Sequence, residues 1–401
     1  MSVAVKPKVE ELLPRSLVRQ RAEAAATVAR EFADDVDRNS RFPTEALAVI
    51  KEGRLLSLMI PVELGGEGAS TAEIANVCSI LGQACSSTAM VFAMHQIKTS
   101  SLVTHGQGSP WHRGFMQQIA DKQLLLASAT TEGGVGGDMR SSICAFEDDT
   151  DAASFRLHKE ANVISYGKTA DAILITARRN AEAPSSDQLM AVVQKHQYVL
   201  EPTIAWDTLG MRGTCSEGFR FSARAPREQI LDKPFGEIAA QSMLAMAHIL
   251  WSGVWYGIAS DAVARARACV RADARKHPGA TPTAARRLTQ TVGALQAMKA
   301  DVLDGLRRFE AAKADEAELS SVAFAVAMNN LKVTTSTAVA DIVRQAMLVA
   351  GIAGYRNDGA HSVGRHMRDA LSAAVMVNND RILSNVEKLM PISRNESGLL
   401  G

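Results

Sequence analysis

The most glycine-rich stretch of the chain, ASATTEGGVGGD (Ala127 to Asp138), has four glycines within five residues. Glycines let a backbone turn sharply and bring several N–H groups close to a flat or anionic ligand. The stretch does not follow the G-x-G-x-x-G pattern of nicotinamide-binding folds, because Met139 occupies the last glycine position. By its residues alone, the stretch is equally compatible with a ligand-binding loop and with an ordinary glycine-rich loop.

Histidines and cysteines are the other residue types that could form a chemical centre. His361 and His366 lie five residues apart, but no H-E-x-x-H pattern or carboxylate cluster accompanies them, so we predict no metal site. The cysteines contain no C-x-x-C pair, which argues against a thiolate metal centre and a disulfide framework. We expect small core residues in a reducing compartment. They are Cys78, Cys85, Cys144, Cys215 and Cys269.

Length and charge limit the possible functions. The chain has 401 residues, 47% of them hydrophobic and 22% charged, which is enough for two or three domains. Its 44 Lys and Arg nearly balance 43 Asp and Glu, and the net charge of +1 argues against nucleic acid or an anionic membrane as a partner. Pro7, Glu10 and Glu11 interrupt the run that a signal peptide needs, and no later stretch approaches the ~20 apolar residues of a membrane span. We therefore expect a cytoplasmic protein with a small-molecule substrate.

The elements that must position these residues fall into three blocks. Ala-rich amphipathic segments predict a helical domain over 1–121, short β-prone runs predict a β domain over 122–236, and a helical bundle is predicted over 237–401. Segregated helices and strands are typical of a multidomain α+β protein, here mainly α, rather than of a βαβ fold. The clearest strands are AILITA (Ala172 to Ala177) and LMAVVQ (Leu189 to Gln194), and the clearest apolar helix face comprises Phe324, Met328, Leu331, Val339 and Ile342.

Several ordered segments resemble one known family. They are RFPTEALAVIKEGRLLSLMIPVELGGEG (Arg41 to Gly68), ISYGKTADAILITAR (Ile164 to Arg178), WDTLGMRGTCSEGF (Trp206 to Phe219) and MRDA (Met367 to Ala370). Together they resemble acyl-CoA dehydrogenases over most of the chain. The resemblance implies an N-terminal helical domain, a middle β-barrel domain and a C-terminal four-helix bundle. It also implies non-covalent FAD between the β domain and the C-terminal helices, and a homo-oligomer, tetramer or dimer.

The glycine-rich loop corresponds to the TEPxxGSD loop of that family. The resemblance implies that Thr131 and Gly136 contact the flavin. Gly133 stands at the Pro, and Gly137 replaces a Ser that commonly contacts the thioester ligand. The loop therefore predicts the flavin site better than the CoA site.

The resemblance also assigns residues that precede the predicted strand AILITA. Ser165 falls where the family places a hydroxyl near the flavin N5, and a hydroxyl can donate or accept as the ring changes redox state. Val163 stands where many relatives carry a Trp packed along the flavin. A smaller side chain there implies room for oxygen or for a bulkier substrate.

Further cofactor contacts are implied in the C-terminal helices. ARRLTQTVGALQAMKAD (Ala285 to Asp301) takes the place of RxxFGxxxxxxQ, whose Arg and Gln reach the FAD of a neighbouring subunit, and AGIAGY (Ala350 to Tyr355) resembles the QxxGGxGY turn. An Arg can form a fork onto a pyrophosphate, although two solvated helix arginines and a helix-capping glycine are the alternative interpretation. The implied residues are Arg286, Arg287, Gln296, Gly351, Gly354 and Asn379.

The catalytic base of the family is missing. We expect a last helical stretch, MRDALSAAVMVNND (Met367 to Asp380), and a gap-free alignment puts Val377 at the family's catalytic Glu, although Val cannot accept a proton. Some relatives take the base from an earlier helix, where Ala247 and His248 now stand at the Glu and Arg. His248, Asp380 and His95 are candidate replacements, and a packed or solvated residue is the alternative for each.

Three functions follow from this pattern. The first is an FAD-dependent α,β-dehydrogenation of an acyl thioester, with a non-standard base and an electron-transfer protein as partner. The second is a monooxygenase on the same scaffold, in which flavin reduced by a flavin reductase reacts with oxygen and a bound substrate is oxidised. The third is a flavin- or acyl-binding protein without turnover. The replacement of the family's Glu by Val377 does not decide between the dehydrogenase and the monooxygenase, because membership of a fold does not fix the reaction.

Overall fold

The computed structural model describes residues 17–134, 139–149 and 153–392. The first block is helical, and local signals explain where its helices begin. Ser70 and Glu73 form a reciprocal capping box at the start of α3, and Ser109 accepts a hydrogen bond from the His112 N–H at the start of α5. The helices are α1 (Leu17–Arg38), α2 (Thr44–Glu52), α3 (Thr71–Gly82), α4 (Ser86–His105) and α5 (Pro110–Lys122), with 3-10 turns at Leu55–Ser57 and Val62–Leu64.

The middle block contains strands arranged in two sheets within the described residues. β4 and β5 are buried along almost their whole length, whereas β3 alternates buried and exposed residues, so its sheet has one solvent face. One sheet has the order β1-β4-β5, and the other has the order β2-β3-β7-β6. The strands are β1 (Leu126–Ala129), β2 (Glu147–Asp148), β3 (Ser154–Ala161), β4 (Ala172–Arg178), β5 (Gln188–Gln194), β6 (Tyr198–Ile204) and β7 (Gly218–Pro226), with 3-10 turns at Lys195–Gln197, Arg212–Thr214 and Arg227–Gln229.

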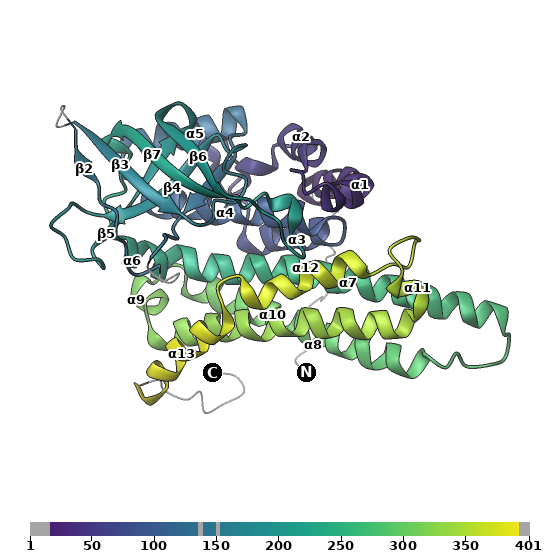
Figure 1. Ribbon diagram of the computed structural model, residues 1–401. Helices are drawn as coiled ribbons and strands as arrows, with labels where there is room; N and C mark the ends of the chain where they lie inside the picture. Colours follow the sequence, from purple (N-terminus) through teal and green to yellow (C-terminus); the bar gives the residue numbers. More distant parts are fainter. Residues whose placement is uncertain (1–16, 135–138, 150–152, 393–401) are drawn as a thin grey trace, which may run out of the picture.

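The last block is a bundle of long helices that runs beneath the other two blocks in Figure 1. The predicted apolar face of α10 is confirmed, because all five of its residues are buried. The elements are α6 (Phe235–Ile238), a π-helical segment (Ala239–Met243), α7 (Leu244–Lys276), α8 (Ala285–Ala312), α9 (Glu316–Leu319), α10 (Val322–Ala350), α11 (Ile352–Tyr355), α12 (Gly364–Val375), α13 (Asn379–Leu389) and a 3-10 turn at Met390–Ile392.

The fold class is therefore confirmed as mainly helical, with the strands confined to the middle of the chain. The change from helix to strand falls between Lys122 and Leu126, and the change back falls between Pro226 and Phe235. Domain limits at 121 and 236 stay a prediction. None of the described helices combines the length and the apolar character needed to cross a membrane. The cytoplasmic location likewise stays a prediction.

One expected element is wrong. The stretch from Met367 to Asp380 is not one helix, because α12 ends at Val375 and α13 begins at Asn379. Val377 has φ of 49°, in the left-handed region that interrupts a right-handed helix, and the Asn378 side chain then caps α13. The position of the missing base is thus a turn between two helices.

Candidate active site

The turn between α12 and α13 has a strained backbone. A positive φ is uncommon outside glycine and is unfavourable for a β-branched residue such as Val377. Such a conformation costs on the order of 1–3 kcal/mol and persists where surrounding contacts determine it. The contacts that hold this turn come from α10.

Lys332 of α10 holds the turn from inside the bundle. Its side chain is fully buried, and Nζ donates to Val377 O at 2.7 Å and to Asn379 Oδ1 at 2.6 Å. Nζ also lies 5.9 Å from the centre of the Trp255 ring. Burial lowers the pKa of Lys332 to about 8. Sequence reasoning missed this residue, although a lysine four residues after Met328 on the apolar face of a helix is a signal that could have found it.

Asn379, predicted to bind the cofactor, directs its side chain into the same bundle. Its Oδ1 accepts the bond from Lys332, and its Nδ2 donates to Ser336 Oγ at 3.0 Å. The amide thus stabilises the first turn of α13. A cofactor contact of Asn379 stays a prediction. Because both polar atoms of the side chain are already bonded, the backbone of Asn379 is the part that could make such a contact.

His248 on α7 is the best placed of the three candidate bases. Its Nδ1 lies 3.0 Å from Met328 O, so the ring donates there and keeps the lone pair on Nε2. However, burial first and the charge of Lys332 second lower the pKa of His248 to about 4. A proton taken up by this ring is therefore poorly stabilised.

His95 and Asp380 are less suited to accept a proton. His95 is fully buried, donates from Nε2 to Leu56 O at 2.7 Å and accepts at Nδ1 from the Leu126 N–H at 3.1 Å, so both ring nitrogens are used. Burial lowers the pKa of His95 to about 4. Asp380 is exposed and lines a surface hollow on α13 together with Leu383. The sequence could not distinguish these environments, because they depend on distant segments.

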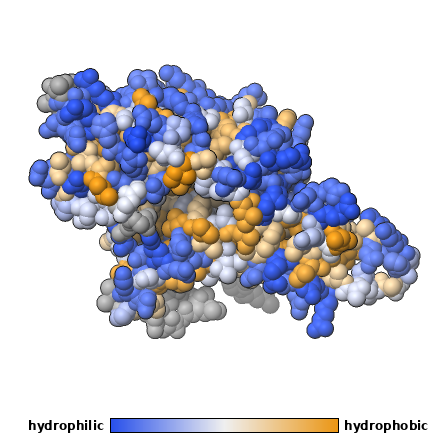
Figure 2. All heavy atoms as spheres, viewed as in Figure 1, coloured by the Kyte–Doolittle hydropathy of each residue, from blue (hydrophilic) through white to orange (hydrophobic). Residues whose placement is uncertain are grey.

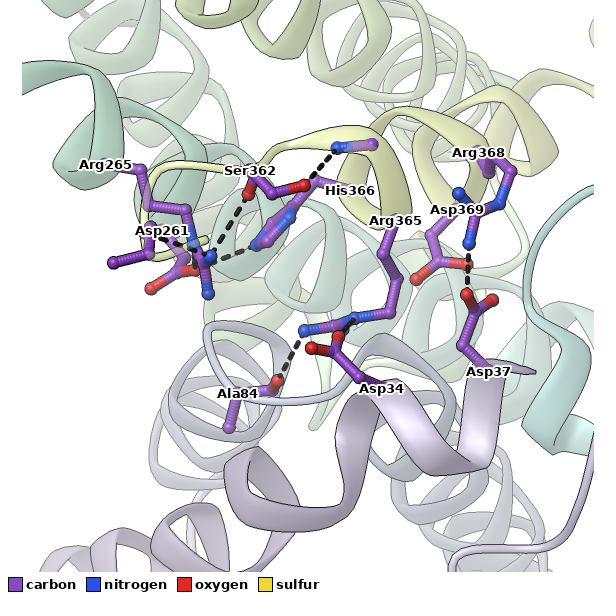
Figure 3. A network of polar contacts seen from close by, with 12 residues as sticks. Asp34, Asp37, Ala84, Asp261, Arg265, Ser362, Arg365, His366, Arg368 and Asp369 are labelled. Atoms are coloured by element: carbon purple, nitrogen blue, oxygen red, sulfur yellow. Dashed lines mark hydrogen bonds and ion pairs between the residues drawn. The ribbon is translucent and has the colours of Figure 1, made fainter. Parts of the chain in front are cut away.

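Charged pairs fix α12, and hence the turn, onto α1 and α7 (Figure 3). Each pair joins the first two turns of α12 to a residue far away in the chain. All of these paired residues except Asp261 line a cleft of about 540 Å³. The pairs are Arg365 with Asp34 at 3.2 Å, His366 with Asp261 at 2.8 Å, and Arg368 with Asp37.

The pair of His366 and Asp261 is the most deeply buried part of this network. Burial alone would raise the pKa of Asp261, but bonds from His366 and Arg265 hold the pKa well below its usual range. Burial lowers the pKa of His366, which we therefore assign as a neutral ring that donates from Nε2. The carboxylate of Asp261, which has Arg265 as its charged partner, thus joins α7 to α12 through a neutral His366.

The loop of residues 206–214 connects α12 to the β domain. Met211 N donates to the buried Asp369 Oδ1 at 2.7 Å. Gly210 is required beside it, because a Cβ there would lie 2.3 Å from Arg368 O. The MRDA motif therefore positions this loop through its Asp.

A chain of hydroxyl groups leads from this loop to Ser165. Met211 O accepts from Thr214 Oγ1 at 2.8 Å, Thr214 Oγ1 lies 2.7 Å from Ser216 Oγ, and Ser216 Oγ lies 2.7 Å from Ser165 Oγ. Ser165 is partly exposed, so the chain ends at a surface. A hydroxyl oriented in this way can donate to or accept from a ligand.

The described part of the glycine-rich loop is bonded to the end of β3, five residues before Ser165 in the chain. Gly133 N donates to Glu160 O at 2.8 Å, which places partly exposed Thr131 next to the end of β3. Val163 is 39% exposed in the same region. An exposed apolar side chain and two partly exposed hydroxyls are group types that suit an isoalloxazine ring, which has apolar faces and a polar edge. Gly136 and Gly137 lie outside the described residues.

The predicted C-terminal contacts lie near one end of the bundle. Arg286, Arg287 and Gln296 are exposed, and Arg287 Nη1 donates to Gln345 Oε1 at 3.1 Å. Gly351 has φ of 61° where α10 ends, and Gly354 is buried against that helix. These residues belong to α8 and to the end of α10, whereas Ser165 lies between β3 and β4. Their contact with a neighbouring subunit's cofactor stays a prediction.

Comparisons with known proteins agree with this architecture. The family models of the acyl-CoA dehydrogenase N-terminal and C-terminal domains match residues 14–109 and 236–380. Cyclohex-1-ene-1-carbonyl-CoA dehydrogenase of Syntrophus aciditrophicus is 25% identical over 58% of this chain, and this chain spans 56% of its length. The protein of the same name from Geobacter metallireducens is 24% identical over 87% of this chain and 90% of its own.

Solved structures share the fold at low identity. FMN-bound TdsC, a dibenzothiophene monooxygenase of Paenibacillus sp. A11-2, has a TM-score of 0.82 and 18% identity over 95% of this chain and 98% of its own. Butyryl-CoA dehydrogenase of Megasphaera elsdenii has a TM-score of 0.77 and 16% identity over 98% and 100%. Two domain matches and this common fold place the chain in the acyl-CoA dehydrogenase family, whose members bind flavin.

Proposed function

We propose that the protein is a reduced-flavin-dependent monooxygenase of a small-molecule substrate. The observation that supports this reaction is the lack of a carboxylate at both positions from which the family draws its base, Val377 and Ala247. Removal of an α proton needs an acceptor within hydrogen-bond reach, whereas monooxygenation does not need that group. The surroundings of His248, His95 and Asp380 leave none of them well suited to replace it.

Flavin, when bound and reduced, would supply two electrons to oxygen, so that one oxygen atom enters the substrate and the other leaves as water. The part of this chain is to bind and orient. Ser165 would present its hydroxyl to the polar edge of the ring, and Val163 would leave space over the ring for oxygen and substrate. The two electrons would come from an external flavin reductase.

We propose FAD as the flavin and a homo-oligomer as the working form. Arg286 and Arg287 are exposed and could bind the pyrophosphate of a neighbouring subunit's FAD. FMN has no pyrophosphate. Ile352 and Tyr355 in the same end of the bundle are 73% and 69% exposed, which suits contact with a second copy. A dimer and a tetramer are both compatible with this surface.

Acyl-thioester dehydrogenation is the second candidate function. The relatives that match most of the chain are named as acyl-CoA dehydrogenases, and the Val377 N–H makes no backbone hydrogen bond within the described residues. A free N–H at this turn could polarise a thioester carbonyl without any side chain. In this reading an electron-transfer protein would accept the electrons.

The test is a rapid-mixing experiment on the FAD-loaded protein. The bound flavin is reduced without air and mixed with oxygenated buffer, and its absorbance is followed. A transient species that differs from both reduced and oxidised flavin is expected. Direct return to the oxidised spectrum, together with reduction of oxidised flavin by an acyl-CoA, would refute the monooxygenase.

A pair of variants separates the second candidate. Val377→Glu should restore reduction of bound flavin by acyl-CoA if the base alone is missing. Val377→Gln has the same shape but cannot accept the proton, and it serves as the control. Equal inactivity of both variants would count against dehydrogenation.

A further inference from the structure

Lys98 on α4 is buried without the partners that a buried ammonium group needs. Its side chain is 5% exposed, and the hydrogen-bond contact of Nζ is the sulfur of Met243, at 3.2 Å. A thioether is a weak acceptor, and an ammonium group has three N–H donors. Among the described residues no carboxylate or carbonyl oxygen bonds to Lys98, so most of its hydrogen-bonding capacity is unused.

The other buried lysines of the described chain show how the fold normally meets this need. Lys332 donates to Val377 O and Asn379 Oδ1, and Lys159 donates to Thr176 O at 2.6 Å. Both ammonium groups thus have oxygen acceptors within the protein. Lys98 has no such oxygen acceptor among the described residues. An unpaired buried charge is strongly unfavourable, so the burial of Lys98 needs another explanation.

The surroundings of Lys98 are polar and have an irregular backbone. Met243 ends the π-helical segment Ala239–Met243, a rare conformation that often occurs at functional sites. On the same face of α4, Ser101 and His105 contact Ser242 of this segment, at 3.5 and 3.2 Å. His105 is only partly buried, so this polar face extends from Lys98 toward the surface.

Lys98 also lies close to the predicted reaction centre. Its contact Met243 is one helical turn before Ala247 along α7, and Ala247 is the position where some relatives carry their base. Residues four apart lie on the same face of a helix, about 5–6 Å from one another. A group bound at Nζ would therefore lie within the length of a small molecule from Ala247.

We propose that Lys98 binds an anionic oxygen group of the substrate, a carboxylate or a sulfur oxyanion. The anion would accept from the N–H donors that Met243 leaves free and would neutralise the buried charge. The remainder of the substrate would extend along α7 toward the turn at Val377. The oxidation of the bound molecule rests on the proposed function. The binding of its anionic group by Lys98 does not depend on that reaction.

The test compares benzoate, benzenesulfinate and uncharged benzamide as probes of the oxidised FAD-loaded protein at pH 7, with isothermal calorimetry and the flavin absorbance as readouts. The wild-type protein should bind an anionic probe at least about tenfold more tightly than benzamide. Lys98→Met should remove this preference and leave benzamide binding unchanged, and Lys98→Arg should retain it. Lys159→Met, which removes an equally buried lysine of the β domain, should retain the preference as well.

Equal binding of benzoate and benzamide to the wild-type protein, or no saturable binding of either anion, would overturn the proposal without any variant. Undiminished anion binding by Lys98→Met would also overturn it. The ratio of benzoate to benzenesulfinate affinity distinguishes the carboxylate from the sulfur oxyanion. The oxygen reaction is measured separately without probe, so a failed monooxygenase assay and a failed anion preference are distinguishable.

Discussion

Replacing Lys98 by Met should stabilise the protein in the absence of ligand. Met is similar in length, lacks the charge, and suits a site whose contact is another methionine sulfur. Burial lowers the pKa of Lys98 from 10.5 to about 8. Each pKa unit corresponds to about 1.4 kcal/mol, so the buried charge costs roughly 3 kcal/mol of unfolding free energy at neutral pH.

The pH dependence of this gain has a definite sign. Below about pH 8 Lys98 is protonated in both states, and the folded state carries the full cost. Between pH 8 and 10.5 the folded protein releases the proton while the unfolded chain keeps it, so wild-type stability rises with pH. The advantage of Lys98→Met should therefore be largest at pH 6–8 and disappear toward about pH 10.5.

Urea unfolding of the two proteins at several pH values measures this difference. The matched control is Lys159→Met, which leaves Thr176 O without its donor and should lower the unfolding free energy by about 1–3 kcal/mol. A loss of stability in Lys98→Met equal to that of the control would refute the reasoning. So would an advantage that does not change with pH.

Three further perturbations address the turn and its supports. Val377→Gly should have an unfolding free energy about 1 kcal/mol higher than that of Val377→Ala in urea unfolding, because both lose the packed valine side chain and only glycine adopts φ of 49° without strain. Lys332→Met should speed hydrogen exchange at the start of α13, because Val377 O and Asn379 Oδ1 lose their donor, and unchanged exchange would contradict the assigned role. Asp369→Ala should lower the unfolding free energy by about 1.5–3 kcal/mol and expose the 206–214 loop to proteolysis, whereas loss of the exposed Asp358 should do neither.

Much of the fold follows from local patterns in the sequence. The strands predicted at 172–177 and 189–194 are β4 and β5, and the apolar face of α10 is buried. A short continuous apolar run is typical of a strand buried on both faces, as β4 and β5 are, and the helical period marks the one apolar side that α10 buries. The break at Val377 was not predicted, because a contact that holds this turn comes from Lys332, 45 residues away in the chain.

The surroundings of the site residues depend on contacts of the same long-range kind. A histidine in α4 or α7 could face a ligand or the core, and the sequence does not distinguish these faces where the helix is buried on all sides, as it is around His95 and His248. His95 proves to bridge Leu56 and Leu126, and both of its nitrogens are used. Lys98, in a helix without a clear polar face, is likewise indistinguishable from a solvated lysine until the partner of its ammonium group is known.

The turn at Val377 indicates which part of the family's machinery this chain retains. A strained backbone is maintained there by Lys332, by the Asn378 cap and by the charged pairs of α12, although the side chain at 377 can neither accept nor donate a proton. If only the carboxylate mattered, its loss would leave no physical reason for this conformation to be so well supported. The supported feature is instead the backbone, whose N–H at 377 makes no backbone hydrogen bond to the described part of the chain and could meet an oxygen of a bound molecule. An anion held at Lys98 and an oxygen met at Val377 would orient a substrate at two points without a base, which is what an oxygen-transfer reaction requires of the protein.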